Sequence, residues 1–254
     1  MRITILGSGN VATHMAAALK NAGHQIVEVF SPSLQNAALL AYHVRAEAVD
    51  DLEQLKSTDL FLIAVKDDAI EETAARLAKY QTPVVHTSGA TSLAVLEKYI
   101  SGAGVFYPLQ TFSKIREVDF KTVPLCIEAN SAELKQMLME LASTISNQVY
   151  EVNSNQRRTL HLAAVFACNF PNYLYHIAQG LLGDAKLDFN LLRPLIMETA
   201  AKVQDNLPNE VQTGPAVRGD EQTMREHLKL LEPDQYLQQV YRLLSEGIGK
   251  MNKT

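Results

Sequence analysis

Residues 3–12 read ITILGSGNVA, a short apolar run followed at once by a G-x-G-x-x-A turn. An alanine-rich stretch then leads to a second apolar run at residues 26–30. This order predicts the strand, turn, helix and strand that bind a dinucleotide. Gly7 permits the tight turn, Gly9 has no side chain to keep a pyrophosphate from the backbone, and Ala12 lets the helix approach the strand. The start of that helix offers unpaired N–H groups and about half a positive charge to phosphates.

Composition and charge exclude several classes of protein. The 254 residues carry a net charge of −5 and scattered basic side chains, so nucleic acid is not an expected partner. The first predicted strand begins at residue 2 or 3, which leaves no room for a signal peptide, and no apolar run is long enough to span a bilayer. Cys126 and Cys168 lie far apart without metal-ligand spacing. We therefore expect a cytoplasmic protein with no metal site and no membrane partner.

The order of predicted elements indicates two domains. Strands are predicted at 2–6, 25–30, 44–48, 60–65, 84–87, 104–107, 123–128 and 149–152, with helices between many of them, such as 10–22, 69–79 and 131–143. From residue 153 only helices are predicted, at 155–182, 189–206, 221–231 and 233–250. We expect an α/β domain at 1–152, a Rossmann-type doubly wound and mostly parallel sheet, followed by a smaller all-α domain at 153–254.

The end of the second strand bears on the choice between NAD and NADP. NAD-binding proteins usually carry an acidic residue there, which would repel a 2′-phosphate. Here the strand ends with Ser31 and Ser33 nearby, whose hydroxyls could hydrogen-bond a phosphate. Glu28 is the alternative, since its spacing from the glycines is close to that of an NAD-type acid, and the 31–33 loop has no Arg. The pattern favours NADP, with NAD as the second choice.

Two further strand ends complete the predicted cofactor groove, because ligands of open parallel sheets bind beyond the carboxyl ends of the strands. The segment 59–70 is one such strand end, and HTSGA at 86–90 is the other. Asp67 and Asp68 are interpreted as helix caps, whereas the Thr-Ser-Gly run could both turn the chain and contact the cofactor. The predicted cofactor-binding residues are Gly7, Ser8, Gly9, Asn10, Val11, Ser31, Ser33, Ala64, Val65, Lys66, Thr87, Ser88 and Gly89.

The predicted helix 155–182 is apolar nearly all round, which is typical of a buried helix. A polar stripe nevertheless follows one side of it, comprising His161, Cys168, Asn172, His176 and Gln179 with Asn169 beside them. A kink at Pro171 would divide this stripe into two parts that face different directions. One interpretation is that these groups hydrogen-bond one another across a helical interface. The other is that the stripe faces the cofactor, with His161 as proton donor and Asn169 as the amide that orients the substrate.

Residues 213–220 form a loop with two glycines, a hydroxyl and Arg218 just before a predicted helix. This composition suits a ligand that carries a carboxylate or another anion. An ordinary loop with a surface Arg is the alternative. We keep Arg218 as a candidate substrate-binding residue.

Several of these segments together resemble a known family. The glycine turn, the segment 59–70, HTSGA at 86–90, YPLQTF at 107–112, and residues 161–169 and 213–220 are similar to Rossmann-like NADP oxidoreductases whose helical C-terminal domain has no defined function. More distantly, the chain is similar to pyrroline-5-carboxylate reductase, F420-dependent NADP reductases and the 6-phosphogluconate dehydrogenase-like superfamily. The resemblance covers nearly the whole chain.

The resemblance implies an NADP-dependent oxidoreductase that moves hydride to or from a C=O or C=N group of a small-molecule substrate. It also implies a homodimer that forms through the helical domain, which would have the 6-phosphogluconate dehydrogenase-like fold. Hydroxyacid dehydrogenases of that superfamily place a Lys on the first long helix of this domain, with an Asn four residues later. Here the helix 155–182 has no Lys, and Val165 follows His161 by four residues. Either His161 replaces the lysine, or the substrate is an imine.

Two other functions are compatible with a glycine-rich turn. A non-catalytic NADP(H)-binding sensor would keep the groove without the chemistry. A methyltransferase would use the turn for S-adenosylmethionine, but the helix opening Asn10-Val11-Ala12 and the resemblance over the whole chain argue against it.

Overall fold

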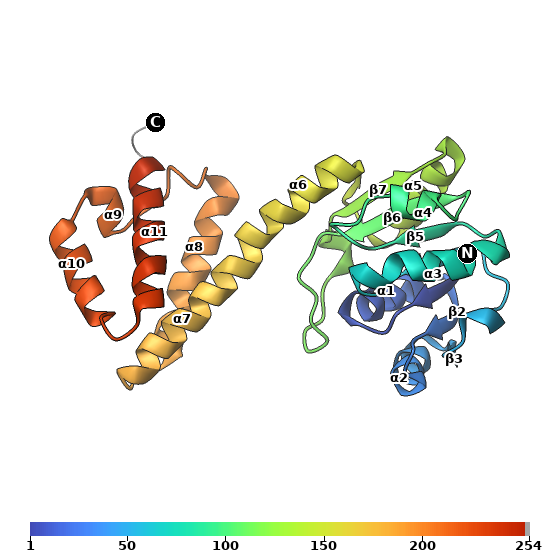
Figure 1. Ribbon diagram of the computed structural model, residues 1–254, viewed down its shortest axis with the longest axis horizontal. Coiled ribbons are helices and arrows are strands. Elements are labelled where there is room, and N and C mark those ends of the chain that lie inside the picture. Colours follow the sequence, from blue (N-terminus) through green and yellow to red (C-terminus); the bar gives the residue numbers. More distant parts are fainter. Residues whose placement is uncertain (252–254) are drawn as a thin grey trace. The chain divides into compact units, whose positions relative to one another are not determined.

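One sheet of eight strands organises the first part of the chain in the computed structural model, which describes residues 1–251. The strand order is β3-β2-β1-β4-β5-β6-β7-β8, and every neighbouring pair is parallel except β6 and β7. The strands are β1 (Arg2–Leu6), β2 (Gln25–Phe30), β3 (Glu47–Val49), β4 (Leu60–Ile63), β5 (Val84–His86), β6 (Ala103–Pro108), β7 (Leu125–Ala129) and β8 (Val149–Glu151). The predicted doubly wound, mostly parallel sheet is therefore confirmed (Figure 1).

Helices connect the strands and cover both faces of this sheet. They are α1 (Asn10–Asn21), α2 (Leu34–Val44), α3 (Ile70–Leu77), α4 (Ala94–Glu97) and α5 (Ala132–Ile145), with short 3₁₀ turns η1 (Leu52–Gln54), η2 (Asp67–Ala69), η3 (Ala78–Tyr80) and η4 (Phe120–Thr122). Side chains of α1, α2 and α5 pack in one apolar core, and those of α3 and α4 pack in another.

Alternating strand residues supply the two cores. In β4, Leu60 and Leu62 belong to the core with α1, whereas Phe61 and Ile63 belong to the core with α3. Successive side chains of a strand point to opposite faces, so a strand buried on both sides is apolar throughout. By the same alternation, Tyr107 of β6 lies on the side of α3 and α4.

Gly7 fixes the turn between β1 and α1. Its φ is +126°, and a Cβ at this position would lie 2.2 Å from the carbonyl oxygen of Ala64. Only glycine can therefore occupy it. The turn brings the end of β1 against the end of β4, where the order of strands reverses, and ligands of open α/β sheets bind at such a point.

The rest of the chain is helical. A continuous run consists of α6 (Ser154–Ala164), the π-helical turn η5 (Val165–Asn169) and α7 (Phe170–Asp184). Pro171 has no N–H to donate to the preceding turn, which accounts for the interruption. After η6 (Phe189–Leu191) come α8 (Arg193–Asp205), α9 (Pro215–Arg218), α10 (Glu221–Leu230) and α11 (Gln235–Met251). Asp220 caps α10 by accepting a hydrogen bond from the Thr223 N–H at 3.1 Å.

The structure departs from the sequence-based expectations for this helical part in two ways. The π-helical turn breaks the regular helical spacing, so the predicted polar stripe does not continue along one face. Leu162 and Phe166, predicted to be buried, are 58% and 63% exposed in the single chain. No described residue of α7, α8, α9, α10 or α11 is buried.

The chain divides into two compact units, Met1–Tyr173 and Leu174–Thr254. The predicted domain boundary between residues 152 and 153 is a different position from the limit between these units. It coincides with the change from strands to helices, between the end of β8 at Glu151 and the start of α6 at Ser154. The first turns of the helical run thus belong to the same compact unit as the sheet. The domain limits 1–152 and 153–254 stay a prediction.

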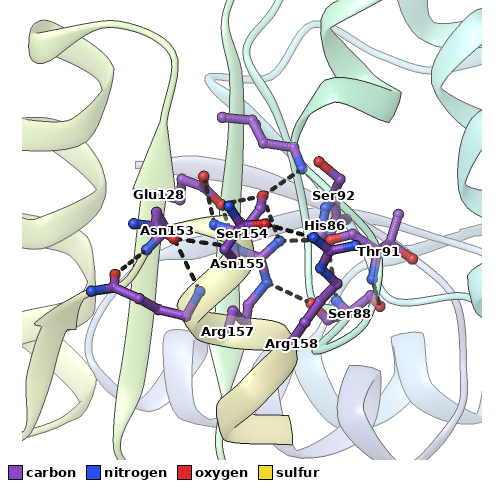
Figure 2. A network of polar contacts seen from close by, with 12 residues as sticks. His86, Ser88, Thr91, Ser92, Glu128, Asn153, Ser154, Asn155, Arg157 and Arg158 are labelled. Atoms are coloured by element: carbon purple, nitrogen blue, oxygen red, sulfur yellow. Dashed lines mark hydrogen bonds and ion pairs between the residues drawn. The ribbon is translucent and has the colours of Figure 1, made fainter.

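Arg157 attaches α6 to the sheet (Figure 2). It is the bulkiest fully buried side chain among residues 1–251, and its guanidinium forms an ion pair with Glu128 of β7. Its remaining donors bond the carbonyl oxygens of Ser88 at 3.2 Å and Thr91 at 2.6 Å, and the hydroxyl of Ser154 at 3.2 Å. One buried cation therefore joins the start of α6 to β7 and to the turn that follows β5.

The partners of Arg157 are themselves satisfied. Glu128 also accepts hydrogen bonds from the backbone N–H of Ser154 at 2.9 Å and from its hydroxyl at 2.8 Å. Asn153 caps α6 in a reciprocal capping box with Gln156. A buried ion pair offsets its desolvation only when its remaining donors and acceptors are bonded, and this one meets that condition.

We predict that replacing Arg157 destabilises the fold strongly. Arg157→Met leaves the Glu128 carboxylate without its cation, and losing one partner of a buried pair costs about 3–5 kcal/mol in the free energy of unfolding. Urea unfolding measures the loss. Arg158→Met is the matched control, since Arg158 is exposed on the same helix, and it should change the free energy by less than about 0.5 kcal/mol. Equal effects of the two substitutions would contradict the anchoring role of Arg157.

Candidate cofactor and substrate site

A cleft of about 780 Å³ opens at the carboxyl ends of the central strands. Its volume lies within the range of about 300–1,000 Å³ that is usual for small-molecule sites. Twelve of the thirteen predicted cofactor-binding residues line it: Gly7, Ser8, Gly9, Asn10, Val11, Ser31, Ala64, Val65, Lys66, Thr87, Ser88 and Gly89. The structure thus brings together three strand ends that are distant in the sequence.

The glycine turn leaves space for a phosphate at the start of α1. A Cβ on Gly9 would meet no atom within 4 Å, and no side chain caps the helix. The N–H groups of the first turn therefore point to an open volume, which is what an anion at a helix start requires. The residues present fit a dinucleotide.

A loop between β6 and β7 lies against this turn. The Asn10 side-chain amide donates to the Phe112 carbonyl at 2.9 Å, a His14 ring nitrogen lies 2.9 Å from the Ser113 carbonyl oxygen, and Lys114 donates to the Ser8 carbonyl at 3.0 Å. The side chain of Asn10 therefore holds the loop, which leaves its backbone N–H at the helix start. Sequence reasoning did not find these contacts, because the loop comes about a hundred residues after the turn.

The end of β2 and the glycine turn each contribute one hydroxyl to the cleft. The Ser8 hydroxyl donates to the Ser31 hydroxyl at 3.1 Å, and both residues line the cleft. Ser33 lies outside the lining and instead caps α2 by accepting from the Asn36 N–H at 3.4 Å. Glu28 also lies outside it, fully buried, with one carboxylate oxygen bonded to the Lys56 N–H at 2.9 Å. Burial raises the pKa of Glu28.

Arg76 is a cation in the cleft that the sequence did not single out. It comes from α3, lines the cleft together with Ser31, and is 40% exposed. Its guanidinium lies 3.7 Å from Asp51 and 3.5 Å from Glu53, which are long ion pairs on the surface. Such pairs are weak, so the guanidinium remains available to a bound anion.

The turn after β5 forms another wall of the cleft. The Thr87 hydroxyl donates to the Ile63 carbonyl at 3.2 Å, and the Ser88 hydroxyl accepts from the N–H groups of Ala90 and Thr91. The Thr-Ser-Gly run therefore turns the chain and also lines the cleft. The interpretation of Asp67 and Asp68 as caps is wrong, because neither side chain bonds the first turn of the helix that follows.

His86, just before this turn, is buried and electrically neutral. Burial, together with the nearby Arg157 charge, lowers the pKa of His86 to about 3. Its Nδ1 accepts from the Ser88 N–H at 3.2 Å. His86 thus supports the turn rather than lining the cleft.

His161 lies in the cleft beside Tyr107. His161 Nδ1 is 3.2 Å from the Tyr107 hydroxyl, and the two rings meet edge to face. A Cβ on Gly89 would lie 2.6 Å from that Nδ1 and 2.9 Å from the Tyr107 ring, so the pair fits only because residue 89 is glycine. Burial raises the pKa of Tyr107 to about 12, and the phenol is therefore protonated at neutral pH. The predicted acid/base residue is thus next to the predicted cofactor residues.

Helix α6 places His161 through Arg157. The two residues are four positions apart and therefore share one face of the helix. Arg157 bonds the Ser88 carbonyl, and His161 lies against Gly89, the next residue of the same turn. Leu160 adds an apolar contact with the core on the side of α3.

The two other candidate catalytic residues are not among those that line the cleft. Asn169 is exposed at the end of η5. Arg218 is exposed at the end of α9 and belongs to the second compact unit. Their roles stay predictions.

Neither a metal-binding cluster nor a membrane-spanning helix is present within residues 1–251. Within residues 1–251, no group of three or more His, Cys, Asp or Glu side chains is arranged to hold a metal ion. None of the helices in the same range has the length and apolar character that crossing a bilayer requires.

Family models match both parts of the chain. Residues 2–88 match the model described as "NADP oxidoreductase coenzyme F420-dependent". Residues 123–248 match a domain of unknown function, DUF2520. None of the curated proteins matches the chain.

Solved structures give the family and the fold. A "putative NADP oxidoreductase" from Bacteroides fragilis is 43% identical, with 98% of each chain covered and a TM-score of 0.94. An imine reductase from Myxococcus stipitatus in complex with NADP+ is 13% identical over all of this chain and 93% of its own, with a TM-score of 0.68. A pyrroline-5-carboxylate reductase from Coxiella burnetii is 17% identical over 99% of this chain and 97% of its own, with a TM-score of 0.58.

At 13% and 17% identity, the likeness to the last two structures shows the fold alone. The Bacteroides fragilis protein is similar over 98% of each chain, and the first family model includes the glycine turn and most of the residues that line the cleft. The chain therefore belongs to the family of Rossmann-type NADP oxidoreductases that carry a helical C-terminal domain.

Proposed function

We propose that this protein is an NADPH-dependent reductase, or the corresponding dehydrogenase, that transfers hydride between the nicotinamide and the carbon of a C=O or C=N group in a small metabolite. The observation that carries the proposal is the position of His161. Its imidazole lines the same cleft as the glycine turn and contacts Gly89 at the end of β5. An imidazole, which can donate or accept a proton, thus lies beside the residues proposed to hold the nicotinamide.

The proposed cofactor site uses backbone donors for the pyrophosphate and side chains for the adenosine end. The N–H groups at the start of α1 would bind the pyrophosphate, for which the open volume at Gly9 leaves space. Ser31 and Arg76 would bind the 2′-phosphate of NADP, since both line the cleft and both carry hydrogen-bond donors. The burial of Glu28 away from the cleft supports NADP over NAD.

We predict tighter binding of NADPH than of NADH, and a specific loss in Arg76→Gln. Removing a charge-assisted hydrogen bond costs about 1.5–3 kcal/mol, which is about a tenfold to hundredfold loss of NADPH affinity. NADH affinity should change little. The emission of the reduced nicotinamide itself measures the NADPH and NADH affinities, because the chain has no Trp that could report binding by energy transfer.

Lys79→Gln is the matched control for Arg76→Gln, because Lys79 also pairs with Glu53 but does not line the cleft. It should leave both affinities unchanged. Preference for NADH in the wild-type protein would contradict the NADP assignment. Equal losses for the two cofactors in Arg76→Gln would contradict recognition of the phosphate by Arg76.

The proposed chemistry divides the work between the cofactor and the protein. Bound NADPH supplies hydride to the substrate carbon, and His161 supplies the proton to the substrate oxygen or nitrogen. We propose that Asn169 orients the substrate and that Arg218 binds a substrate carboxylate. Both side chains are exposed. The amide of Asn169 can donate and accept hydrogen bonds, and the guanidinium of Arg218 can pair with a carboxylate.

We predict that His161→Gln lowers turnover without weakening cofactor binding. A positioned proton donor contributes about 10²–10⁴-fold to the rate, so reduction should slow by that factor. Oxidation of NADPH with a panel of cyclic imines and 2-oxo acids measures turnover, and nicotinamide emission measures binding. Unchanged turnover would exclude His161 as the proton donor. Tight NADPH binding without turnover in the wild-type protein would favour the non-catalytic sensor.

We also propose a homodimer that forms through residues 153–254. The support is the exposure of large apolar side chains on the helices after β8, including Leu162, Phe166, Phe170, Leu191, Leu195, Met197 and Leu243. An isolated helical region of this size gains stability when it shares a core with a second copy. Exposed apolar surface of this extent is also unusual for a monomer.

Light scattering on the eluting protein is expected to give twice the chain mass of 28.1 kDa. Leu195→Glu on α8 should shift the protein towards monomer, because it puts a charge into the proposed interface. Leu39→Glu on α2 is the control, since Leu39 is 62% exposed and Leu195 is 61% exposed. A wild-type protein of single-chain mass at micromolar concentration would contradict the dimer.

A further inference from the structure

The Tyr107 hydroxyl has one hydrogen-bond partner in the part of the chain that the structure describes, and that partner is His161 Nδ1 at 3.2 Å. Tyr107 is only 7% exposed, and it lines the cleft together with His161. A phenol hydrogen that is buried without an acceptor costs about 1–3 kcal/mol. The hydroxyl is therefore satisfied by donating to Nδ1.

The same contact determines which ring nitrogen of His161 remains available. A neutral imidazole carries one proton, and the nitrogen that accepts a hydrogen bond is the one without it. Donation from Tyr107 to Nδ1 accordingly puts the ring proton on Nε2. Nε2 has no hydrogen-bond partner within residues 1–251, although the side chain lines the cleft.

Close packing holds the two rings in this arrangement. Gly89 would collide with both of them if it carried a Cβ. Arg157, one helical turn before His161, is bonded to the carbonyl of the preceding Ser88. The imidazole thus has a fixed backbone on one side and the Tyr107 hydroxyl at Nδ1.

We propose that Tyr107 is a positioning residue that holds Nδ1 of His161 and thereby makes Nε2 the atom that exchanges a proton with the substrate. The inference rests on the proposed function, in which His161 is the proton donor. A hydroxyl suits this position because it both donates and accepts. It donates to Nδ1 of the neutral ring and accepts from Nδ1–H of the imidazolium.

The proton balance follows from the two protonation states. During reduction the imidazolium gives the Nε2 proton to the substrate oxygen or nitrogen, while the substrate carbon receives the hydride. The ring is then left in its other neutral form, with the proton on Nδ1 accepted by the Tyr107 oxygen, while the phenol hydrogen turns to the cleft that Tyr107 also lines. A solvent proton returns to Nε2 and restores the imidazolium. Tyr107 keeps its own proton throughout, in agreement with the high pKa that burial gives it.

The test compares Tyr107→Phe with wild type by ¹⁵N NMR of histidine-labelled protein, at a pH where the His161 ring is neutral. The spectrum of His161→Gln identifies the His161 signals among those of the seven histidines. In the wild type we expect the proton on Nε2 and an accepting Nδ1. In Tyr107→Phe, which keeps the ring packing, we expect a mixture of the two tautomers.

Two further variants separate the role of the hydroxyl from general effects. Gly89→Ala displaces the pair by the collision described above and should give the same mixture. Tyr80→Phe removes a hydroxyl that joins η3 to η1, where it donates to the Leu52 carbonyl at 2.7 Å and accepts from the Leu55 N–H at 3.1 Å, and it should leave the His161 signals unchanged. A wild-type tautomer ratio in Tyr107→Phe would overturn the proposal.

Kinetics provide the second readout. Losing a neutral hydrogen bond to Nδ1 should lower kcat by about threefold to tenfold in Tyr107→Phe, with NADPH affinity unchanged. A Tyr107→Phe enzyme with wild-type kcat would overturn the positioning role. If the wild-type protein turns over no substrate, the proposed function fails by itself, and the tautomer measurement alone decides whether Tyr107 holds His161.

Discussion

The guanidinium of Arg157 is completely buried and bonds groups from three separate segments of the chain. It neutralises Glu128 on β7 and bonds the two carbonyls of the turn after β5, so α6 must begin at one position relative to the sheet. Because His161 follows by one helical turn, the same contacts bring its imidazole to Gly89 and Tyr107. The buried ion pair of Arg157 and Glu128 thus determines where α6 and its His161 lie in the wall of the cleft.

Those parts of the fold that depend on local sequence could be predicted. The strands β1 and β2 begin and end at the predicted residues, because short, mostly apolar runs that stop at a Gly or Ser are typical of buried strands. The glycine turn was predicted for the reason the structure gives, since Gly7 has a positive φ and no room for a Cβ. Twelve predicted residues meet in one cleft because the ends of parallel strands share one edge.

The remaining features depend on tertiary contacts that no local pattern contains. Arg157 and Arg158 are adjacent and chemically identical, yet one is buried and the other is exposed, because consecutive helical residues face different directions. Tyr107 and His161 are 54 positions apart and meet only because α6 returns to the sheet. The polar stripe was predicted on the assumption of regular helical spacing, and the π-helical turn at Val165–Asn169 interrupts that spacing.

A crystal structure of the protein with NADPH bound would show whether Arg157 and the turn after β5 set His161 at the reacting end of the cofactor. We expect the pyrophosphate at the N–H groups that follow Gly9 and the nicotinamide against Thr87–Gly89. We also expect Nδ1 of His161 on Tyr107 and Nε2 facing the space beside the nicotinamide. A nicotinamide bound away from Gly89, or a His161 ring with Nε2 turned towards Tyr107, would contradict this arrangement.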